Sequence, residues 1–297
     1  MTDTAATSAP AGSPTYDVEE LVRGLETDGI VACKGAFSRD WAARMHEDIL
    51  AAFDEAIARE GGAVGRGPKR YYVEIHPEQL RGFVELTTHP WVHAVCQAVL
   101  GDDYQFVEVG FDVPFPGAMN QPWHRDFRSP PETYRDHRLT SLASNLTAVD
   151  TIPEMGPFEI AHGTQWEEGE HFDNGMFPPQ ADWPRYQALA QRKLPKMGDI
   201  SARSALTLHR GTANHSDQAR PVLILGVDAA GNHDARHEMS MTREFYDALP
   251  AELLPHLEIV TVVDELTPVV QKHTIEGLVM GDSGDDAGMG GMAGSAG

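Results

Sequence analysis

Two side chains that can bind a transition metal lie two residues apart in the segment Gln121-Pro-Trp-His-Arg-Asp-Phe127. The segment has the composition of a β-strand, and side chains at positions i and i+2 of a strand point to the same face. His124 and Asp126 would therefore direct an imidazole nitrogen and a carboxylate oxygen at one point. With a second histidine they would form the 2-His-1-carboxylate triad, which suits non-haem Fe(II) and leaves coordination positions open. The pair alone also fits a solvated surface.

A third ligand occurs in a second segment, Leu206-Thr-Leu-His-Arg-Gly-Thr-Ala-Asn-His-Ser-Asp-Gln-Ala-Arg220. Its pattern predicts a strand, a turn and another strand, with His209 at the end of the first strand. His215 is the alternative ligand, but it lies in the turn, close in sequence to Arg220. We therefore expect the metal ligands to be His124, Asp126 and His209.

Arg220 opens the strand that follows this turn. A hairpin would place its guanidinium beside the metal pocket. A dicarboxylate cosubstrate that chelates iron needs a planar, bidentate partner for its far carboxylate, and a guanidinium provides one. The alternative is a surface arginine at the start of a strand, but the combination with the three metal ligands favours the cosubstrate role.

Other polar residues near these motifs have weaker assignments. Gln121 and Asn145 lie on predicted core strands and could donate hydrogen bonds to the cosubstrate, or they could be ordinary polar strand residues. Arg125 and Arg128 flank the metal-binding pair and could meet an anionic substrate. We expect both of these arginines to be solvated.

The elements that must position these residues follow from hydrophobic periodicity. Helices are predicted at residues 18–27, 40–59 (with Ser38 as N-cap), 90–100 and within 239–257. Strands are predicted at residues 29–35, 105–115, 121–127, 142–149, 156–161, 199–208 and 220–228. Many short strands without βαβ alternation indicate a mainly β protein with flanking helices and a jelly-roll-like, cupin-like core.

The chain has 297 residues, of which 45 are acidic and 23 are basic, giving a formal net charge of −22. Nucleic acids and anionic membranes bind clustered Lys and Arg, so this balance excludes both partners and favours a neutral or cationic small molecule. No apolar run reaches the ~18 residues of a membrane span, and no signal peptide is visible. We therefore expect a cytoplasmic protein. Its oligomeric state stays open.

Both ends of the chain are poor in large apolar residues. Residues 1–16 contain mainly Ala, Thr, Ser, Gly and Pro, and residues 281–297 are rich in Gly, Ala and Ser. Such segments cannot bury enough apolar surface to offset the loss of chain entropy. We expect two disordered tails on a single domain that spans residues 17–280.

Four segments together resemble the phytanoyl-CoA dioxygenase family of Fe(II)/2-oxoglutarate-dependent oxygenases. They are Leu25-Glu-Thr-Asp-Gly-Ile-Val31, Trp123-His-Arg-Asp-Phe127, Gly156-Pro-Phe-Glu-Ile-Ala-His-Gly-Thr-Gln165 and the stretch from His209 to Arg220. The resemblance implies a double-stranded β-helix core, Fe(II) on His124, Asp126 and His209, and 2-oxoglutarate on Arg220. It covers most of the predicted domain.

One of these segments departs from the family pattern. Where the family has proline-glycine-serine-histidine, this chain has His162-Gly-Thr-Gln165. The departure leaves the metal ligands in place, but it changes the loop and any substrate contact made there.

The resemblance also implies a reaction. Three protein ligands leave three positions on an octahedral iron for 2-oxoglutarate and O2. Decarboxylation of 2-oxoglutarate to succinate and CO2 would then drive oxidation of an unactivated C–H bond of a small molecule, such as a secondary metabolite. Asp126 favours hydroxylation or another oxidation over halogenation, which needs a small residue there. The alternative is a cupin-like protein that binds a metal or ligand without redox chemistry.

Overall fold

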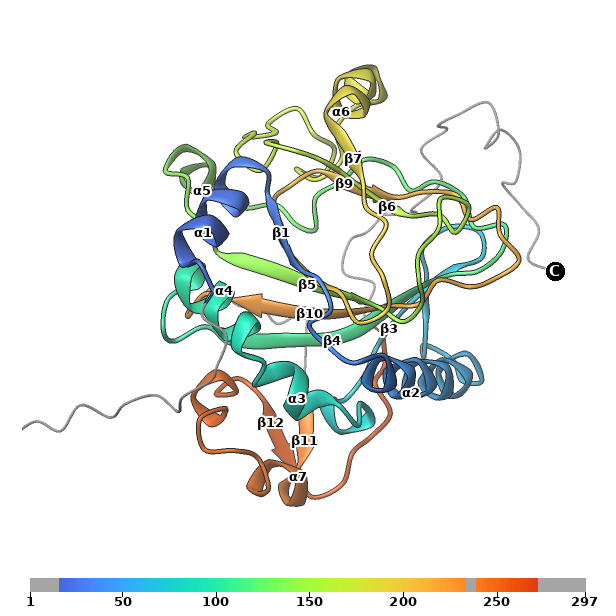
Figure 1. The fold of residues 1–297 in the computed structure, drawn as a ribbon, viewed down its shortest axis with the longest axis vertical. Coiled ribbons are helices and arrows are strands. Elements are labelled where there is room, and N and C mark those ends of the chain that lie inside the picture. The colour runs from blue at the N-terminus through green and yellow to red at the C-terminus, as the bar shows by residue number, and fades with distance from the viewer. Residues whose placement is uncertain (1–15, 233–238, 272–297) are drawn as a thin grey trace, which may run out of the picture.

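The described strands of the computed structural model form a large antiparallel sheet, a small antiparallel sheet and a parallel pair (Figure 1). The structure describes residues 16–232 and 239–271. The large sheet has the order β1-β8-β5-β10-β4-β3-β2, and the small sheet has the order β7-β6-β9. The strands of the large sheet are β1 (Ile30–Cys33), β2 (Val64–Gly65), β3 (Arg70–Glu74), β4 (Gln105–Pro114), β5 (Ser141–Thr147), β8 (Ile200–Ser204) and β10 (Val222–Asp228). The others are β6 (Phe158–Ala161), β7 (Ala190–Arg192), β9 (His209–Gly211), β11 (Ser240–Thr242) and β12 (Thr261–Val263).

Helices flank this β-structure. They are α1 (Val18–Thr27), α2 (Arg39–Ile57), α3 (Phe83–Thr87), α4 (Pro90–Leu100), α5 (Pro131–Arg135), α6 (Trp183–Leu189) and α7 (Arg243–Asp247), with 3-10 turns at Pro77–Gln79, Gln180–Asp182 and Leu254–His256. Ser38 caps α2 as predicted, because its hydroxyl accepts a hydrogen bond from the Trp41 N–H at 3.1 Å. Gly101 ends α4 with φ +95°, a backbone conformation that residues other than glycine rarely adopt.

Side chains that alternate along the strands of the large sheet point either into the hydrophobic core or into a cavity on the other face. On β10, Leu223 and Leu225 are fully buried in a core cluster that also contains residues of α1 to α4. Val222 and Ile224 alternate with them and line a cavity on the opposite face. Residues i and i+2 share a face, so one face of the sheet packs on helices while the other is available to a ligand.

The prediction of a mainly β protein with flanking helices and a double-stranded β-helix core is confirmed. The helices predicted at residues 18–27 and 90–100 have the predicted bounds. The predicted strands at 29–35, 105–115, 142–149, 156–161 and 220–228 correspond to β1, β4, β5, β6 and β10, with shorter limits.

Two predicted strands are wrong, and one predicted helix is shorter than its range. Residues 121–127 form no regular strand, since only His124 makes a bridge, and it does so with His209. Residues 199–208 are not continuous, because β8 ends at Ser204 and a turn leads to β9, which His209 begins. The helix predicted within 239–257 is present but short, because α7 spans only Arg243–Asp247 between β11 and a 3-10 turn, and Pro250 and Pro255 cannot continue a helix.

The termini are described in part. Tyr16, which the composition assigned to the N-terminal tail, is partly buried and packs against the core. Residues 1–15 and 272–297, which include the rest of both predicted tails, lie outside the described residues. No helix among the described residues is long and apolar enough to cross a membrane.

Candidate active site

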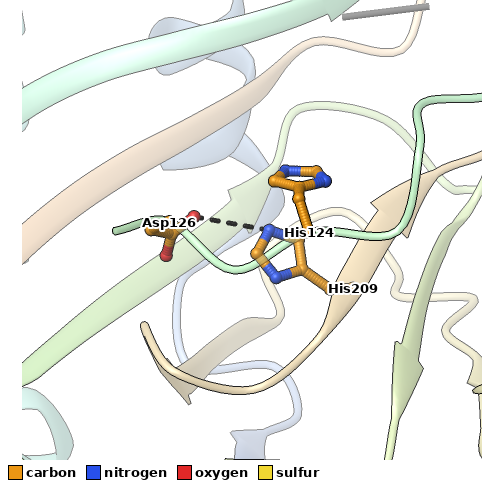
Figure 2. A group of neighbouring side chains, drawn as sticks. All are labelled: His124, Asp126 and His209. Atoms are coloured by element: carbon orange, nitrogen blue, oxygen red, sulfur yellow. Dashed lines mark ion pairs between the residues drawn. The ribbon is translucent and has the colours of Figure 1, made fainter. Parts of the chain in front are cut away.

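The two histidines of the predicted triad are held side by side by the backbone. The His124 N–H donates to the His209 carbonyl at 3.0 Å, and the His209 N–H donates to the His124 carbonyl at 2.8 Å. Their imidazole centroids lie 4.4 Å apart. Figure 2 shows both rings beside Asp126, with an ion pair drawn between Asp126 and His209. The irregular segment thus positions the ligands that we expected from a strand.

Carbonyl groups fix the tautomer of each ring. His124 Nδ1 lies 2.8 Å from the Pro122 carbonyl, and His209 Nδ1 lies 2.9 Å from the Thr207 carbonyl. A carbonyl only accepts, so each Nδ1 carries the proton and each Nε2 keeps a free lone pair. A partner of this kind on the distal nitrogen is typical of metal-binding histidines.

A buried arginine holds the carboxylate of the triad. Arg203, on β8, donates from Nη1 and Nη2 to the two oxygens of Asp126, at 2.5 and 3.0 Å. The Asp126 Oδ1 atom also lies 3.4 Å from His209 Nε2. Burial favours the neutral carboxyl, but the charge of the Arg203 guanidinium and its hydrogen bonds outweigh it and hold the pKa of Asp126 well below its usual range. The carboxylate is therefore ionised and fixed in orientation.

This donor set fits a divalent metal. One ligand atom from each of His124, Asp126 and His209 lies within 4.8 Å of the others, and this is the one such group found among residues 16–232 and 239–271. Burial lowers the pKa of both imidazoles, so they are neutral, as metal ligation requires. Two imidazoles and one carboxylate with an open side are the donors of non-haem Fe(II) sites.

Arg220 lies in the same cavity as the triad, just before β10. β9 and β10 belong to different sheets, so the predicted hairpin does not exist, and the connection crosses from the small sheet to the large one. Arg220 is 4% exposed, and its Nε donates to the Gly156 carbonyl at 3.0 Å. Burial, reinforced by the charge of Arg70, lowers the pKa of Arg220 to about 10. A buried guanidinium without a carboxylate partner among the described residues is a ready site for an anion.

Arg70 is paired with a carboxylate and lines the same cavity as Arg220. Its Nη1 pairs with Asp112 at 2.8 Å, and its Nη2 donates to the Thr212 carbonyl at 3.0 Å. A Cβ atom on Gly211 would lie 2.5 Å from Arg70 Nη1, so a side chain at that position would displace the Arg70 guanidinium. The pairing of Arg70 with Asp112 thus leaves the charge of Arg220 available to a ligand.

Gln121 and Asn145 both line the cavity. The Gln121 side-chain oxygen accepts a hydrogen bond from the Gly211 N–H at 2.8 Å, which ties the segment before His124 to β9. Asn145 lies on the cavity face of β5, opposite Ile224 of β10. Gln121 therefore has a positioning contact, while Asn145 faces the space that a ligand would fill.

The cavity between the sheets has a volume of about 850 Å³. His124, Asp126, His209 and Arg220 all line it, and small-molecule sites typically occupy cavities of this size. His215, the alternative ligand, is exposed and does not line it.

Sequence reasoning missed or misplaced two arginines. Arg203 carries no motif, and its role depends on the register that places β8 beside β5. Arg125 was expected to be solvated, but it is fully buried between the rings of Tyr134 and Phe172, at 4.8 and 4.7 Å. Only Arg128 of the flanking pair is exposed.

Comparisons with known proteins agree with this architecture. The structure is similar to the non-heme alpha ketoglutarate dependent carbocyclase SnoK from nogalamycin biosynthesis, with a TM-score of 0.56 and 22% identity over 74% of this chain and 88% of that one. It is also similar to EctD from S. alaskensis with 2-oxoglutarate and 5-hydroxyectoine, with a TM-score of 0.57 and 16% identity over 79% and 81% of the two chains. EctD with bound Fe gives a TM-score of 0.57 at 15% identity, over 80% and 82%.

No curated protein sequence matches the chain. The family model described as Phytanoyl-CoA dioxygenase (PhyH) matches residues 25–222, which include the triad and Arg220. This span is more than half of the chain, and the structure provides the antiparallel sheets and the His-x-Asp and His group that the family's Fe(II)/2-oxoglutarate chemistry needs. The chain therefore belongs to the phytanoyl-CoA dioxygenase family of Fe(II)/2-oxoglutarate-dependent oxygenases.

Proposed function

We propose that this protein is a dioxygenase that hydroxylates, or otherwise oxidises, an unactivated C–H bond of a small molecule, using Fe(II), 2-oxoglutarate and O2 and releasing succinate and CO2. The observation that carries the proposal is the presence in one cavity of the His124, Asp126 and His209 donor group and of the buried Arg220, which has no direct carboxylate partner among the described residues. A metal and a dicarboxylate would each meet the partner that their chemistry requires.

Three side chains would hold the iron. His124 and His209 would bind through Nε2, because their Nδ1 atoms are engaged by backbone carbonyls. Asp126 would bind through an oxygen while Arg203 keeps the carboxylate in place. Iron held there would supply the site at which O2 and 2-oxoglutarate react.

Arg220 would bind the far carboxylate of 2-oxoglutarate. Its guanidinium presents parallel N–H donors that match two carboxylate oxygens, and burial strengthens such a charge-assisted pair. Asn145, on the cavity face of β5, is available as a further donor to the same molecule. Water exclusion by the walls of the cavity would protect the reaction from side products.

The reaction type follows from the carboxylate of the triad. Halogenating relatives need room for a halide where the carboxylate stands, and Asp126 fills that position with a side chain fixed by Arg203. Hydroxylation or another oxidation therefore fits this site.

Calorimetric titration tests the binding part of the proposal. Mn(II) can replace Fe(II) without reacting with air, and 2-oxoglutarate should bind to the Mn(II)-loaded protein much more tightly than to the metal-free protein. Asp126→Ala should abolish this dependence, while His215→Ala, which alters an exposed histidine outside the cavity, should retain it. Equal binding of 2-oxoglutarate with and without metal would contradict a shared site.

A further inference from the structure

The departure from the family pattern at residues 162–165 has two different structural outcomes. Gln165 is fully buried, and its amide donates to the carbonyl of Glu26 at 2.6 Å, so it fastens the loop to the end of α1. His162 instead lines the cavity, directly after β6. Only His162 can therefore contact a ligand.

His162 is the centre of a three-residue chain of polar contacts. Its Nε2 lies 2.9 Å from Lys193 Nζ, and its Nδ1 lies 3.4 Å from an oxygen of Asp28. An ammonium group only donates, so Nε2 must accept and the ring proton must be on Nδ1, facing Asp28. This arrangement orients the ammonium of Lys193 and uses one of its three N–H donors.

Lys193 keeps the capacity to bind a further group. It is partly buried and lines the cavity, and no carboxylate of the described residues lies within 4.0 Å of its Nζ. Burial lowers its pKa, against the opposing charge of Asp28, as expected for an ammonium that is short of direct counter-charge.

Lys193 and His162 lie beside the candidate metal site along the small sheet. His209 on β9 pairs with Ile160 on β6, and His162 is two residues further on, about 7 Å at the rise of a strand. Phe158 of the same strand has its ring 5.3 Å from that of His209, and its carbonyl accepts a hydrogen bond from the Lys193 N–H. The lining of the cavity also includes apolar residues, among them Ile30, Phe158 and Leu194.

The charge of the cavity is opposite to that of the chain. Among the described residues that line it, nine are Lys or Arg and seven are Asp or Glu, whereas the whole chain has 23 and 45. A concave site with excess positive charge in an acidic protein attracts and concentrates an anion. The cavity thus reverses the preference for a neutral or cationic substrate suggested by net charge.

We propose that Lys193, oriented by His162, binds a carboxylate of the substrate, which makes the substrate a small organic acid with an apolar segment between its carboxylate and the carbon that is oxidised. This inference rests on the proposed function, since it places the substrate beside the iron. A single ammonium matches a singly charged carboxylate, and the apolar residues of the cavity match an alkyl or similar segment.

The test compares three probes of equal length: hexanoate, hexanamide and hexylammonium. Each is titrated into the protein loaded with Mn(II), which replaces Fe(II) and prevents the reaction. Saturating 2-oxoglutarate is present so that Arg220 is occupied. Binding is followed by ligand-observed NMR, and relaxation of the probe's protons by Mn(II) shows which end is near the metal, because this effect falls steeply with distance.

The variants are Lys193→Met, His162→Ala and the control Lys196→Met, which removes the same charge from an exposed lysine that does not line the cavity. The parent protein and Lys196→Met should bind hexanoate at least about tenfold more tightly than hexanamide, and hexylammonium least. Lys193→Met should lose this preference, and His162→Ala should reduce it. In the parent, Mn(II) should relax the methyl end of hexanoate more strongly than the protons next to the carboxylate.

Equal binding of the three probes, or an unchanged preference in Lys193→Met, would overturn the proposal. So would stronger relaxation at the carboxylate end. Affinities for Mn(II) and 2-oxoglutarate are measured on the same samples. If the parent binds both and shows no preference for the acid, only the Lys193 site fails; if it binds neither, the proposed function fails as well.

Discussion

His124 and His209 exchange a pair of backbone hydrogen bonds, at 3.0 and 2.8 Å, although they come from segments far apart in the sequence. This bridge aligns the two imidazoles whose Nδ1 atoms are fixed by carbonyls. The geometry of these two candidate metal ligands is therefore set by the backbone. Preorganised ligands bind a metal without an added cost of ordering the side chains.

The ligand assignment predicts a clear difference between two nearby histidines. His209→Ala should weaken Mn(II) binding by about 100-fold or more, since removal of a ligand should exceed the 10–100-fold effect of residues that only support ligands. His215→Ala should leave the affinity unchanged, because His215 is exposed and outside the cavity. Anaerobic Fe(II) or aerobic Mn(II) titrations measure both. The reverse result would reject His209 as a ligand.

Arg220 should control the 2-oxoglutarate requirement without affecting metal affinity. Truncating one partner of a buried charge pair costs on the order of 2–5 kcal/mol. Arg220→Ala should therefore raise the apparent 2-oxoglutarate requirement by roughly 30-fold or more, at about 1.4 kcal/mol per tenfold. The 2-oxoglutarate requirement of Arg220→Lys should lie between those of the parent and Arg220→Ala, because Lys keeps the charge but lacks the two parallel N–H donors of the guanidinium. Titrations in which Arg220→Ala saturates at the same 2-oxoglutarate concentration as the parent would disprove the assignment.

Arg203 should stabilise the metal-free protein more than the metal-bound one. Arg203→Met leaves the Asp126 carboxylate without its buried partner, and breaking such a pair costs on the order of 3 kcal/mol. A bound divalent cation would restore the missing charge, so Mn(II) should recover much of the lost free energy of unfolding. Urea unfolding with and without Mn(II) measures this difference.

Arg192→Met is the matched control, because half-exposed Arg192 pairs with Glu159 and not with a proposed ligand. Its effect on the free energy of unfolding should be small and independent of Mn(II). An equal loss of stability in Arg203→Met with and without metal would show that Arg203 has no link to the metal site.

The free energy of unfolding of the metal-free protein should decrease as the pH falls below about 6.5, the ordinary value for histidine. Every described histidine with a shifted pKa has it lowered; burial is the leading cause for His46, His89 and His93. The unfolded chain therefore binds protons first, and stability present above this pH is lost as the pH falls toward the lowered folded values. Urea unfolding at about pH 7.5 and 5.5 measures the change.

His93→Gln should show a shallower dependence on pH, because it removes one of these groups while its amide oxygen can still accept the hydrogen bond that Tyr104 makes with His93. A free energy of unfolding that stays constant or rises between the two pH values would contradict the lowered pKa values.

The sequence predicted those helices whose periodicity and end signals lie within the helix itself. Helix α1 and helix α4 follow from periodicity and end signals, and Ser38 was identified as a cap by its position. The same reasoning joined residues 199–208 into one strand, because it could not see that the chain leaves the large sheet after Ser204 and enters the small sheet at His209. That change of sheet depends on tertiary packing, which periodicity in the sequence does not report.

The candidate site was predictable where residue type alone carries the chemistry. His124, Asp126, His209 and Arg220 share the cavity as expected. Arg203 was not predictable, because an arginine in a β-rich run becomes a partner of Asp126 only through strand order and register. Lys193 was missed for the same reason, since its contact with His162 joins the end of β7 to the end of β6.

Succinate formation from 2-oxoglutarate, measured in air with Fe(II) and compared with Asp126→Ala, tests the central claim most directly. An oxygenase built on His124, Asp126 and His209 should release succinate only when Fe(II), O2 and the intact carboxylate are all present, even if release is slow without the substrate. Asp126→Ala should fold and release none. If the parent protein binds metal and 2-oxoglutarate but forms no more succinate than Asp126→Ala, the protein is a binding module and the account is wrong.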